Sequence, residues 1–422
     1  MRVEPAAQVV GHVGVPGDKS ISHRAVLIGA LAEGETLVRG FGRSLDTEAT
    51  VAAVRALGAE VEEPAIDELV VHGWGEPREG EVDCANAGTL MRLLAGVLAG
   101  RRGEWTLTGD ASLAQRPMER VAAPLRELGA RVETTDGHAP LRLGGGSLRG
   151  ISYELPVASA QVKSALLLAG LRAVGDTTVL EPVPSRDHTE LMLEAAGADV
   201  RRRPHTVTVS PAPLLRLPEV EVPGDFSSAA PLLVAAALVP GGDLTVHDLG
   251  LNPLRAHLLD VLERMGARVS VFNRRKAGGE PVGSVQVQQG ELVATEIRPG
   301  EVPLLVDELP LVALLASHAR GETRVRGAGE LRVKESDRIE AVTDGLQALG
   351  ARIHSREDGW TITGVPVRLR GGRLDARGDH RIAMLGAVAG LASIDGVEIE
   401  GADIAAISFP GFYDLLDSVS RR

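Results

Sequence analysis

The hydrophobic pattern of the chain predicts two kinds of helix that alternate along it. In the first kind, nearly every position is apolar, as in the run SALLLAGL that follows Lys163. In the second kind, apolar and polar residues recur with a helical period, as in residues 47–57 and 120–128. A helix that is apolar all round is expected to be buried, whereas an amphipathic helix lies at the surface. The pattern therefore predicts inner helices covered by outer ones.

The apolar helices recur six times. Each copy has a polar start, an apolar run, a glycine and then a predicted strand. The copies begin near Lys19, Asn86, Ser159, Asp225, Asp307 and Asp379.

A Gly-Ala step follows five of the amphipathic runs and precedes a strand. The glycines are Gly58, Gly129, Gly197, Gly266 and Gly350. A glycine at this place is typical of a helix end in the left-handed conformation. The steps are about 70 residues apart, which is long enough for one compact α/β unit. We expect six such units and an α/β fold.

Two similar Pro-Gly steps predict how the units are divided between domains. A sixth amphipathic helix, Phe409–Val419, ends the chain, and the strand around Val3–Val15 is expected to complete its unit. The chain would then pass between domains at Pro16-Gly17 and at Pro223-Gly224, and either step could act as a hinge. We expect one domain of residues 1–15 and 223–422, with units four to six. Residues 16–222, with units one to three, form the other.

Composition narrows the class of protein. A chain of 422 residues is too long for one ordinary core, and a net charge of −12 argues against nucleic-acid binding. The N-terminus lacks the pattern of a signal peptide, and the apolar runs are too short to span a bilayer. A single Cys excludes an internal disulfide and suits a reducing compartment. No Cys/His cluster has zinc spacing. We expect a cytoplasmic protein.

The side chains suited to chemistry gather at the starts of the apolar helices. A helix N-terminus offers unpaired N–H groups to phosphate or carboxylate. Cations accompany several of these starts: Lys19, Arg24, Arg92, His380 and Arg381. The polar residues there have a second interpretation, because Ser159, Asp225 and Asn86 could act only as N-caps. Only four lysines occur, and chance placement stays open for Lys163 and Lys276.

Six ordered motifs between Val15 and Pro410 resemble those of the 5-enolpyruvylshikimate-3-phosphate (EPSP) synthase family. They are Lys19-Ser-Ile-Ser-His-Arg24, Asn86-Ala-Gly-Thr89, Arg116-Pro117, Ser159-Ala-Gln161, Arg332-Val-Lys-Glu-Ser-Asp-Arg338 and Asp379-His-Arg-Ile-Ala-Met384. Arg186, within Ser185-Arg-Asp-His-Thr189, is similar to a variety of the family that supplies an Arg to the shikimate ring.

This resemblance implies two domains, each built from three βαβαββ units around buried parallel helices. It also implies transfer of the enolpyruvyl group of phosphoenolpyruvate to the 5-hydroxyl of shikimate 3-phosphate. Neither an organic cofactor nor a metal is expected. The partners are these two small molecules, with no nucleic acid and no membrane, and a monomer is expected.

The resemblance further implies roles for single residues. Phosphoenolpyruvate is expected to be bound by Lys19, Asn86, Gly88, Arg116, Gln161, Arg338, His380 and Arg381. Shikimate 3-phosphate is expected to be bound by Lys19, Ser20, Arg24, Ser159, Ala160, Gln161, Arg186, Asp307 and Lys334. The reaction needs a base for the hydroxyl and an acid for the methylene carbon. We assign the base to Asp307 and the carbon proton transfer to Glu335 and Lys19. Asp307 could otherwise be only a helix cap.

Two rival functions and one departure from the family pattern remain. Many members carry a Lys in the last motif, which here reads Ile404-Ala-Ala-Ile407-Ser-Phe-Pro410. A UDP-N-acetylglucosamine enolpyruvyl transferase normally has a Cys before its Arg-Pro element, but residues 110–115 contain none. Cys84 is expected to be a small buried residue. A repeat protein that only binds phosphorylated metabolites is the other alternative, against which Lys19, Asp307, Glu335 and Arg381 argue.

Overall fold

A computed structural model describes residues 1–422 and divides them into two compact units. The terminal unit comprises residues 1–16, 223–275 and 281–422, and the inserted unit comprises residues 17–222 and 276–280. The chain passes between the units after residues 16 and 222, and the expected boundaries after residues 15 and 222 differ from these by at most one residue. Residues 276–280, however, were expected in the terminal unit. Whether the units fold as independent domains stays a prediction.

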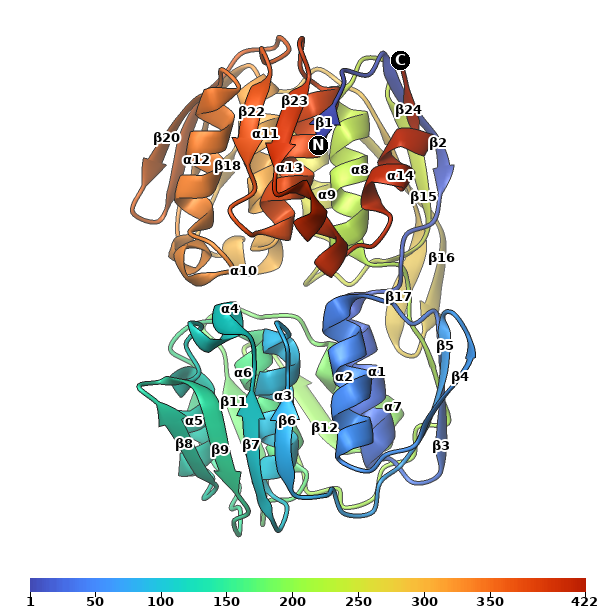
Figure 1. Ribbon diagram of the computed structural model, residues 1–422, viewed down its shortest axis with the longest axis vertical. Coiled ribbons are helices and arrows are strands. Elements are labelled where there is room, and N and C mark those ends of the chain that lie inside the picture. The colour runs from blue at the N-terminus through green and yellow to red at the C-terminus, as the bar shows by residue number, and fades with distance from the viewer. The chain divides into compact units, whose positions relative to one another are not determined.

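The inserted unit contains three four-stranded sheets, with orders β14-β3-β5-β4, β6-β7-β9-β8 and β10-β11-β13-β12 (Figure 1). Their strands are β3 (Glu35–Arg39), β4 (Val61–Ala65), β5 (Glu68–His72), β6 (Gly80–Asp83), β7 (Glu104–Thr108), β8 (Arg131–Thr135), β9 (His138–Gly144), β10 (Ser152–Glu154), β11 (Thr177–Leu180), β12 (Val200–Arg203), β13 (Thr206–Val209) and β14 (Glu219–Glu221).

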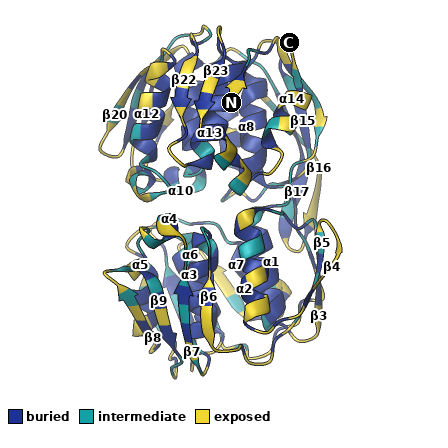
Figure 2. Ribbon diagram, in the orientation of Figure 1, coloured by how far each residue is buried: buried dark blue, intermediate teal, exposed yellow.

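Helices of two kinds accompany these sheets, as the hydrophobic pattern predicts. The apolar ones, buried over most of their length, are α1 (Lys19–Leu31), α3 (Gly88–Ala99) and α6 (Ala160–Gly170). The others, which keep exposed positions, are α2 (Leu45–Ala56), α4 (Ala111–Ala114), α5 (Glu119–Glu127) and α7 (His188–Ala195). Figure 2 shows the contrast in burial between the two kinds.

The terminal unit repeats this plan with sheets ordered β16-β17-β15-β2-β24, β18-β19-β21-β20 and β1-β23-β22. Its strands are β1 (Arg2–Val3), β2 (Gln8–Val13), β15 (Asp243–Gly250), β16 (Arg268–Ala277), β17 (Glu280–Gln288), β18 (Glu296–Ile297), β19 (Gly321–Val325), β20 (Arg352–Arg356), β21 (Gly359–Gly364), β22 (Gly372–Asp375), β23 (Val397–Glu400) and β24 (Ser420–Arg421).

The helices of the terminal unit again fall into the two kinds. Its apolar helices are α8 (Phe226–Leu238), α11 (Leu309–His318) and α13 (His380–Leu391). The remainder are α9 (Leu258–Met265), α10 (Val302–Leu305), α12 (Arg338–Ala348), α14 (Phe412–Ser418) and the 3₁₀ turns η1 (Gly329–Val333) and η2 (Ala402–Ile407). The predicted last helix over 409–419 is therefore shorter than expected.

One prediction about the N-terminal strand is wrong in part. Only β1 joins the sixth sheet, antiparallel to β23, whereas β2 lies parallel to β15 in the fourth. In every other sheet, the strand equivalent to β15 also has a parallel neighbour, as β7 has β6. In the fourth sheet, β2 is this parallel neighbour of β15. The strand that directly precedes α8 is β14, and it pairs with β3 in the inserted unit instead.

The five predicted glycine turns are confirmed. Gly58, Gly129, Gly197, Gly266 and Gly350 have φ values of 105°, 104°, 88°, 103° and 99°. These angles lie in the region that L side chains rarely adopt, so glycine is required where each outer helix turns into its strand.

Close helix packing explains another glycine. A Cβ added to Gly96 of α3 would lie 2.2 Å from the backbone oxygen of Ala165 in α6. No side chain fits in that space, so Gly96 lets these two buried helices approach closely. Their N-termini are thereby held near each other, which matters for the residues described below.

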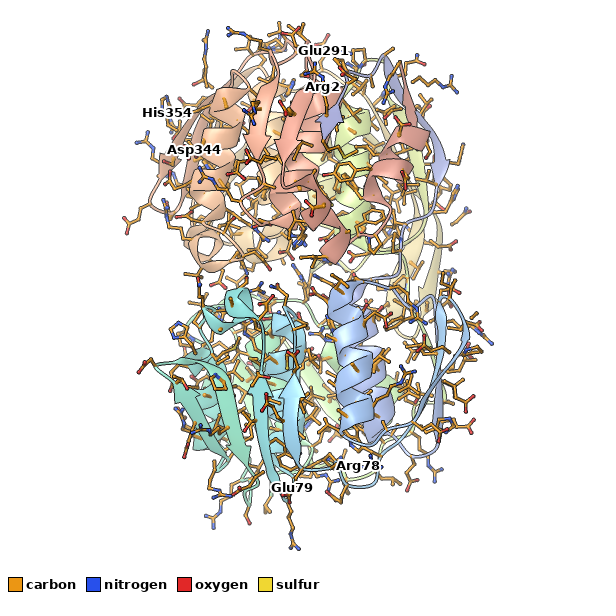
Figure 3. The ribbon with its side chains drawn as sticks, viewed as in Figure 1. Arg2, Arg78, Glu79, Glu291, Asp344 and His354 are labelled. Carbon is orange, nitrogen blue, oxygen red and sulfur yellow. The ribbon has the colours of Figure 1, made fainter.

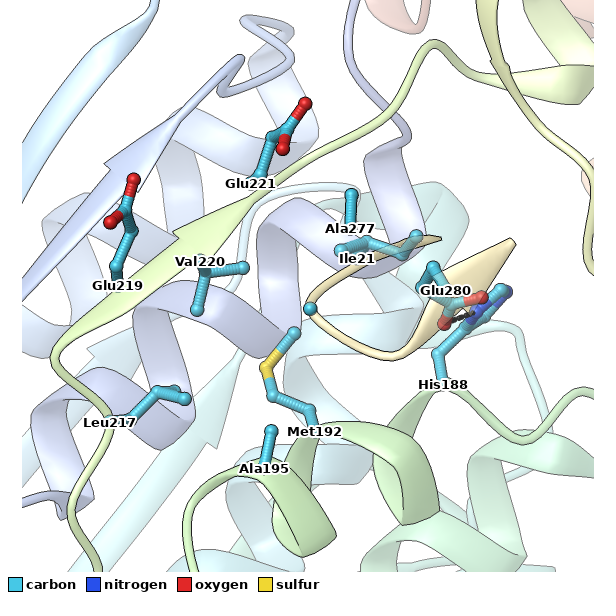
Figure 4. A pocket seen from close by; sticks show the side chains of 11 residues that line it. Ile21, His188, Met192, Ala195, Leu217, Glu219, Val220, Glu221, Ala277 and Glu280 are labelled. Atoms are coloured by element: carbon cyan, nitrogen blue, oxygen red, sulfur yellow. Dashed lines mark hydrogen bonds and ion pairs between the residues drawn. The ribbon is translucent and has the colours of Figure 1, made fainter. Parts of the chain in front are cut away.

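The tip of the β16–β17 hairpin belongs to the inserted unit although its strands lie in the other. Glu280 of this tip accepts a hydrogen bond from His188, whose Nδ1 lies 2.6 Å from Oε1 (Figure 4). Both side chains are buried. Beside them is a cavity of about 20 Å³ whose lining includes Ile21, Met192 and Ala277, roughly the room that one water molecule needs.

Candidate active site

In the inserted unit, the first turns of α3 and α6 meet around one network of polar side chains. Arg92 Nη1 donates to Gln161 Oε1 at 2.7 Å, and Gln161 Nε2 donates to Thr89 Oγ1 at 2.9 Å. Arg116 Nη2 donates to Asn86 Oδ1 at 2.6 Å. The structure therefore brings together residues from three of the predicted motifs.

Asn86 does not cap α3, so that alternative is wrong. The N-cap is Ala87, without a side-chain hydrogen bond, and the Asn86 amide instead donates to Asp110 at 2.7 Å. The cap interpretation holds for Ser159, which accepts from the backbone N–H of Val162 at 3.4 Å, with Ala160 as the first residue of α6.

Gly88 keeps the space in front of the two arginines open. A Cβ at this position would lie 2.8 Å from Arg92 Nη1 and 3.2 Å from Arg116 Nη1. Both guanidinium groups thus approach the first turn of α3, where the helix also offers backbone N–H groups. Such a combination favours an anion with oxygen acceptors.

The start of α1 carries a second group of cations in the inserted unit. Lys19 Nζ lies 2.7 Å from Asp46 Oδ2, while Asp18 caps the helix through the Ile21 N–H. Arg24 is buried and donates to the Ser20 carbonyl at 2.8 Å. Burial lowers the pKa of Arg24 to about 10, and the charge of the neighbouring Arg186 acts in the same direction. An anion near these guanidinium groups would offset their repulsion.

In the terminal unit, guanidinium groups surround the carboxylate of Asp307. Arg255 Nη1 lies 3.1 Å from Oδ2, and Arg338 Nη1 and Arg381 Nε each lie 3.6 Å from Oδ1. Helix α11 begins at Leu309 with Glu308 as its N-cap. The alternative that Asp307 is only the cap of this helix is therefore wrong.

A tight ion cluster joins two further motifs. Arg338 Nε donates to Asp379 Oδ2 at 2.7 Å, and its Nη2 donates to Glu335 Oε2 at 2.5 Å. Burial disfavours the charged guanidinium, but Asp379 and Glu335 outweigh it and raise the pKa of Arg338. The Arg338 side chain is only 1% exposed, so it serves to hold the carboxylates of Asp379 and Glu335 in place. The Glu335 side chain is 21% exposed and therefore accessible.

Arg381, His380 and Lys334 complete the predicted residues of this unit. Arg381 Nη1 donates to the Asp307 carbonyl at 3.1 Å, and His380 is the first residue of α13. Lys334 lies 3.5 Å from Glu330. Burial lowers the pKa of Lys334, while Glu330 and Asp307 act in the opposite direction. Asp225 caps α8 by accepting from the Ser227 N–H, so the N-cap interpretation also holds for this residue.

Sequence reasoning missed several members of these clusters. Arg255 comes from the loop after β15, outside the repeated helix starts, and bonds Asp225 at 3.3 Å as well as Asp307. Buried Glu308 accepts from Ser227 of α8. Neither residue lies in a motif, and only their tertiary neighbours mark them. The nearest sequence signal is the turn Asn252-Pro253 that precedes Arg255.

These clusters are suited to binding anions and to moving protons. Among all 422 residues, no three His, Cys, Asp or Glu side chains are grouped so as to hold a metal ion. No helix is both long and apolar enough to cross a membrane. Cys84 is fully buried as predicted, and burial raises the pKa of its thiol, which makes it a poor nucleophile.

Comparison with known proteins gives one consistent result. A model of the EPSP synthase (3-phosphoshikimate 1-carboxyvinyltransferase) family matches residues 3–416. A relative from Halorhodospira halophila, named 3-phosphoshikimate 1-carboxyvinyltransferase, is 52% identical over 98% of this chain and 95% of its own. A relative of the same name from Desulforudis audaxviator is 49% identical over 99% of both chains.

A solved structure agrees with the sequence relatives. EPSP synthase from Acinetobacter baumannii superposes with a TM-score of 0.88 at 42% identity, over 99% of this chain and 98% of that one. Family and fold therefore agree along nearly the whole chain. The chain belongs to the EPSP synthase (3-phosphoshikimate 1-carboxyvinyltransferase) family.

Proposed function

We propose that this protein transfers the enolpyruvyl group of phosphoenolpyruvate to the 5-hydroxyl of shikimate 3-phosphate, releasing phosphate and forming EPSP. The observation that carries the proposal is the 52% identity, over 98% of the chain, to a relative named for this reaction. The reaction belongs to the shikimate pathway, which leads to chorismate and aromatic amino acids.

The chemistry of the substrates fits the side chains. Each substrate carries one phosphate and one carboxylate, and arginine binds both groups in bidentate fashion. In the inserted unit, we assign phosphoenolpyruvate contacts to Asn86, Gly88, Arg116 and Gln161. The network in which Arg116 and Gln161 already take part holds these groups in place, so little ordering remains to be done on binding.

Contacts to shikimate 3-phosphate form a second set in the inserted unit. We assign them to Lys19, Ser20, Arg24, Ser159, Ala160, Gln161 and Arg186. Lys19 serves both substrates. Arg24 and Arg186 bind the negative groups of shikimate 3-phosphate, because the two guanidinium groups are close enough for their charges to interact.

Residues of the terminal unit supply the remaining groups. Arg381, His380 and Arg338 act on phosphoenolpyruvate, and Asp307 and Lys334 on shikimate 3-phosphate. Nε and Nη2 of Arg338 donate to Asp379 and Glu335. On this proposal it acts chiefly by neutralising those carboxylates and orienting Glu335.

The reaction proceeds by addition and elimination. Asp307 accepts the proton of the 5-hydroxyl as its oxygen attacks C2 of phosphoenolpyruvate. Glu335 and Lys19 deliver a proton to the methylene carbon, which becomes a methyl group. In the elimination, Glu335 and Lys19 take a proton back from that methyl carbon, the C2–O bond to phosphate breaks, and the enol ether double bond forms. The proton taken from the 5-hydroxyl leaves with the phosphate.

A phosphate-release assay tests the proposal. The purified protein should release phosphate when phosphoenolpyruvate and shikimate 3-phosphate are both present, and not when either is omitted. Replacing shikimate 3-phosphate with UDP-N-acetylglucosamine tests the rival enzyme. Two results would overturn the proposal: phosphate release only with the nucleotide sugar, or no phosphate release with either acceptor.

A further inference from the structure

Lys163 is a buried cation that the proposed reaction does not use. It lies in the first turn of α6, and its side chain is 2% exposed. Its ammonium group is 2.8 Å from Glu181 Oε2, 2.8 Å from Glu190 Oε1 and 3.0 Å from the carbonyl oxygen of Ser185. An ammonium has three donors, so these three acceptors saturate it.

All three acceptors belong to the short segment that carries Arg186. Glu181 directly follows β11, Ser185 immediately precedes Arg186, and Glu190 lies in the first turn of α7. Ser185 Oγ also donates to Glu181. One buried ammonium thus holds the beginning, the middle and the end of the connection between β11 and α7.

Other buried groups fix the same segment just after Arg186. Arg24 Nε donates to Thr189 Oγ1 at 2.6 Å, and the Ser164 hydroxyl lies 2.7 Å from the same oxygen. His188 is held by Glu280, which comes from the hairpin tip. Arg186 itself is half-buried, as Asp187 is, whereas Ser185 and residues 188–190 are buried.

A purely stabilising role does not explain this arrangement well. Removing two carboxylates and an ammonium from water costs several kcal/mol per ion, which offsets much of their attraction. Apolar side chains of the same volume would fill this space at least as favourably. A saturated ion cluster does, however, fix the path of the backbone, because each hydrogen bond has a defined direction and length.

We infer that Lys163 is a positioning residue for Arg186. Through Glu181, Glu190 and the Ser185 carbonyl it holds the connection in the one shape that presents the Arg186 guanidinium to an anionic substrate. The inference rests on the proposed function, in which Arg186 binds shikimate 3-phosphate. Lys163 does not touch the substrate, so its loss should alter shikimate 3-phosphate binding and leave phosphoenolpyruvate binding unchanged.

The test uses the double variant Lys163→Met/Glu181→Gln. It removes one positive and one negative charge together, so the net charge of the buried cluster stays the same. Arg101→Met is the matched control, since Arg101 is also buried in the inserted unit but bonds the Gly75 carbonyl, far along the chain from Arg186. Thermal unfolding establishes that each variant is folded.

We expect the double variant to raise the dissociation constant of shikimate 3-phosphate about tenfold, the lower range for a lost charge-assisted hydrogen bond. The KM for phosphoenolpyruvate should stay as in the parent. In an Arg186→Ala background, the double variant should cause no further loss of affinity, because the group it positions is gone. Arg101→Met should bind both substrates normally.

The outcomes separate the inference from the proposed function. If the parent protein does not turn over shikimate 3-phosphate, the proposed function fails. If the parent is active and Arg186→Ala weakens binding, but the double variant does not, the inference fails. Additive losses in the two backgrounds also overturn it. Should the double variant not fold, Glu181→Gln alone loosens Ser185 and takes its place in the same cycle.

Discussion

Arg255 bonds Asp307: Nη1 of the guanidinium lies 3.1 Å from Oδ2 of the carboxylate. Arg338 and Arg381 each approach the other carboxylate oxygen to 3.6 Å. Because Glu308 occupies the N-cap of α11, the position of Asp307 is not set by helix capping. Its carboxylate is held by side chains of separate elements, as expected for a group with a chemical role.

Asp307→Asn should therefore separate chemistry from structure. Asparagine keeps the shape and one acceptor oxygen for Arg255, but an amide cannot take the proton of the 5-hydroxyl. We expect turnover to fall by roughly 10²–10⁴-fold, the usual span for general acid–base catalysis. Phosphate release measures turnover, while calorimetry with shikimate 3-phosphate and thermal unfolding should give near-parent values.

The control for this substitution is Asp344→Asn, at an exposed carboxylate of α12 that pairs with the exposed Arg377 (Figure 3). Its turnover should equal that of the parent. Near-parent turnover of a folded Asp307→Asn protein would exclude Asp307 as the base and leave Glu335 as the leading carboxylate.

Arg186→Ala should act on substrate binding. It removes contacts made in the ground state and the transition state alike, so KM rises while kcat changes little. Loss of a charge-assisted hydrogen bond costs about 1.5–3 kcal/mol, equivalent to about 10- to 150-fold in the dissociation constant of shikimate 3-phosphate. Calorimetry measures it directly. Arg78→Ala, at an exposed position, should bind normally, and unchanged affinity in Arg186→Ala would refute the assignment.

Gly88→Ala should act on the other substrate. The added Cβ would stand 2.8 Å from Arg92 Nη1 and 3.2 Å from Arg116 Nη1, so the ends of both flexible side chains must move. We expect the KM for phosphoenolpyruvate to rise about tenfold, near the value of one charge-assisted hydrogen bond. Shikimate 3-phosphate affinity should not change.

Gly75→Ala provides a matched comparison, because a Cβ there meets nothing within 4 Å. It should leave both substrate constants as in the parent. An equal KM for phosphoenolpyruvate in Gly88→Ala would show that the space in front of Arg92 and Arg116 is not where this substrate binds.

The buried His23 of α1 predicts a pH dependence of stability. Burial lowers the pKa of His23 to about 3, with Lys19 and Arg24 acting in the same direction and Asp46 against it. In the unfolded chain the pKa is about 6.5. As the pH falls below that value, the unfolded state takes up a proton that the folded state refuses, so stability is lost between about pH 6.5 and 3.

From His23 alone, we expect the free energy of unfolding to fall by about 2 kcal/mol between pH 7 and pH 5. Denaturant unfolding at several pH values measures this slope. His23→Gln should lack this part of the slope whatever its absolute stability, because glutamine does not titrate. His354→Gln, at an exposed position, should keep it (Figure 3). Equal slopes in His23→Gln and the parent would contradict the prediction.

The repeated helices and turns could be predicted because their signals are local. Gly58 and its equivalents mark helix ends through backbone conformation alone, and the apolar runs mark buried helices through composition. The pairing of β2 with β15 and of β14 with β3 could not be predicted in the same way. Both are short strands, and their partners are decided by which sheet edge each one reaches.

The candidate site shows the same division. Residues in motifs, such as Asn86 and Arg381, could be located from the sequence, and the structure places them at helix starts. Arg255 and Asp46 carry no motif, since each is defined only by the charge it meets in the fold. Asp307 lies one residue before the helix cap, a difference that hydrophobic periodicity is too coarse to detect.

The hairpin tip at residues 276–280 has a consequence for how this protein can be divided. A polypeptide that comprised residues 17–222 alone would lack Glu280, leave buried His188 without that carboxylate, and open the cavity beside Met192 to water. The inserted segment is thus not a self-contained cassette. A chimera that exchanges it between relatives should also carry the five residues 276–280 from the same parent.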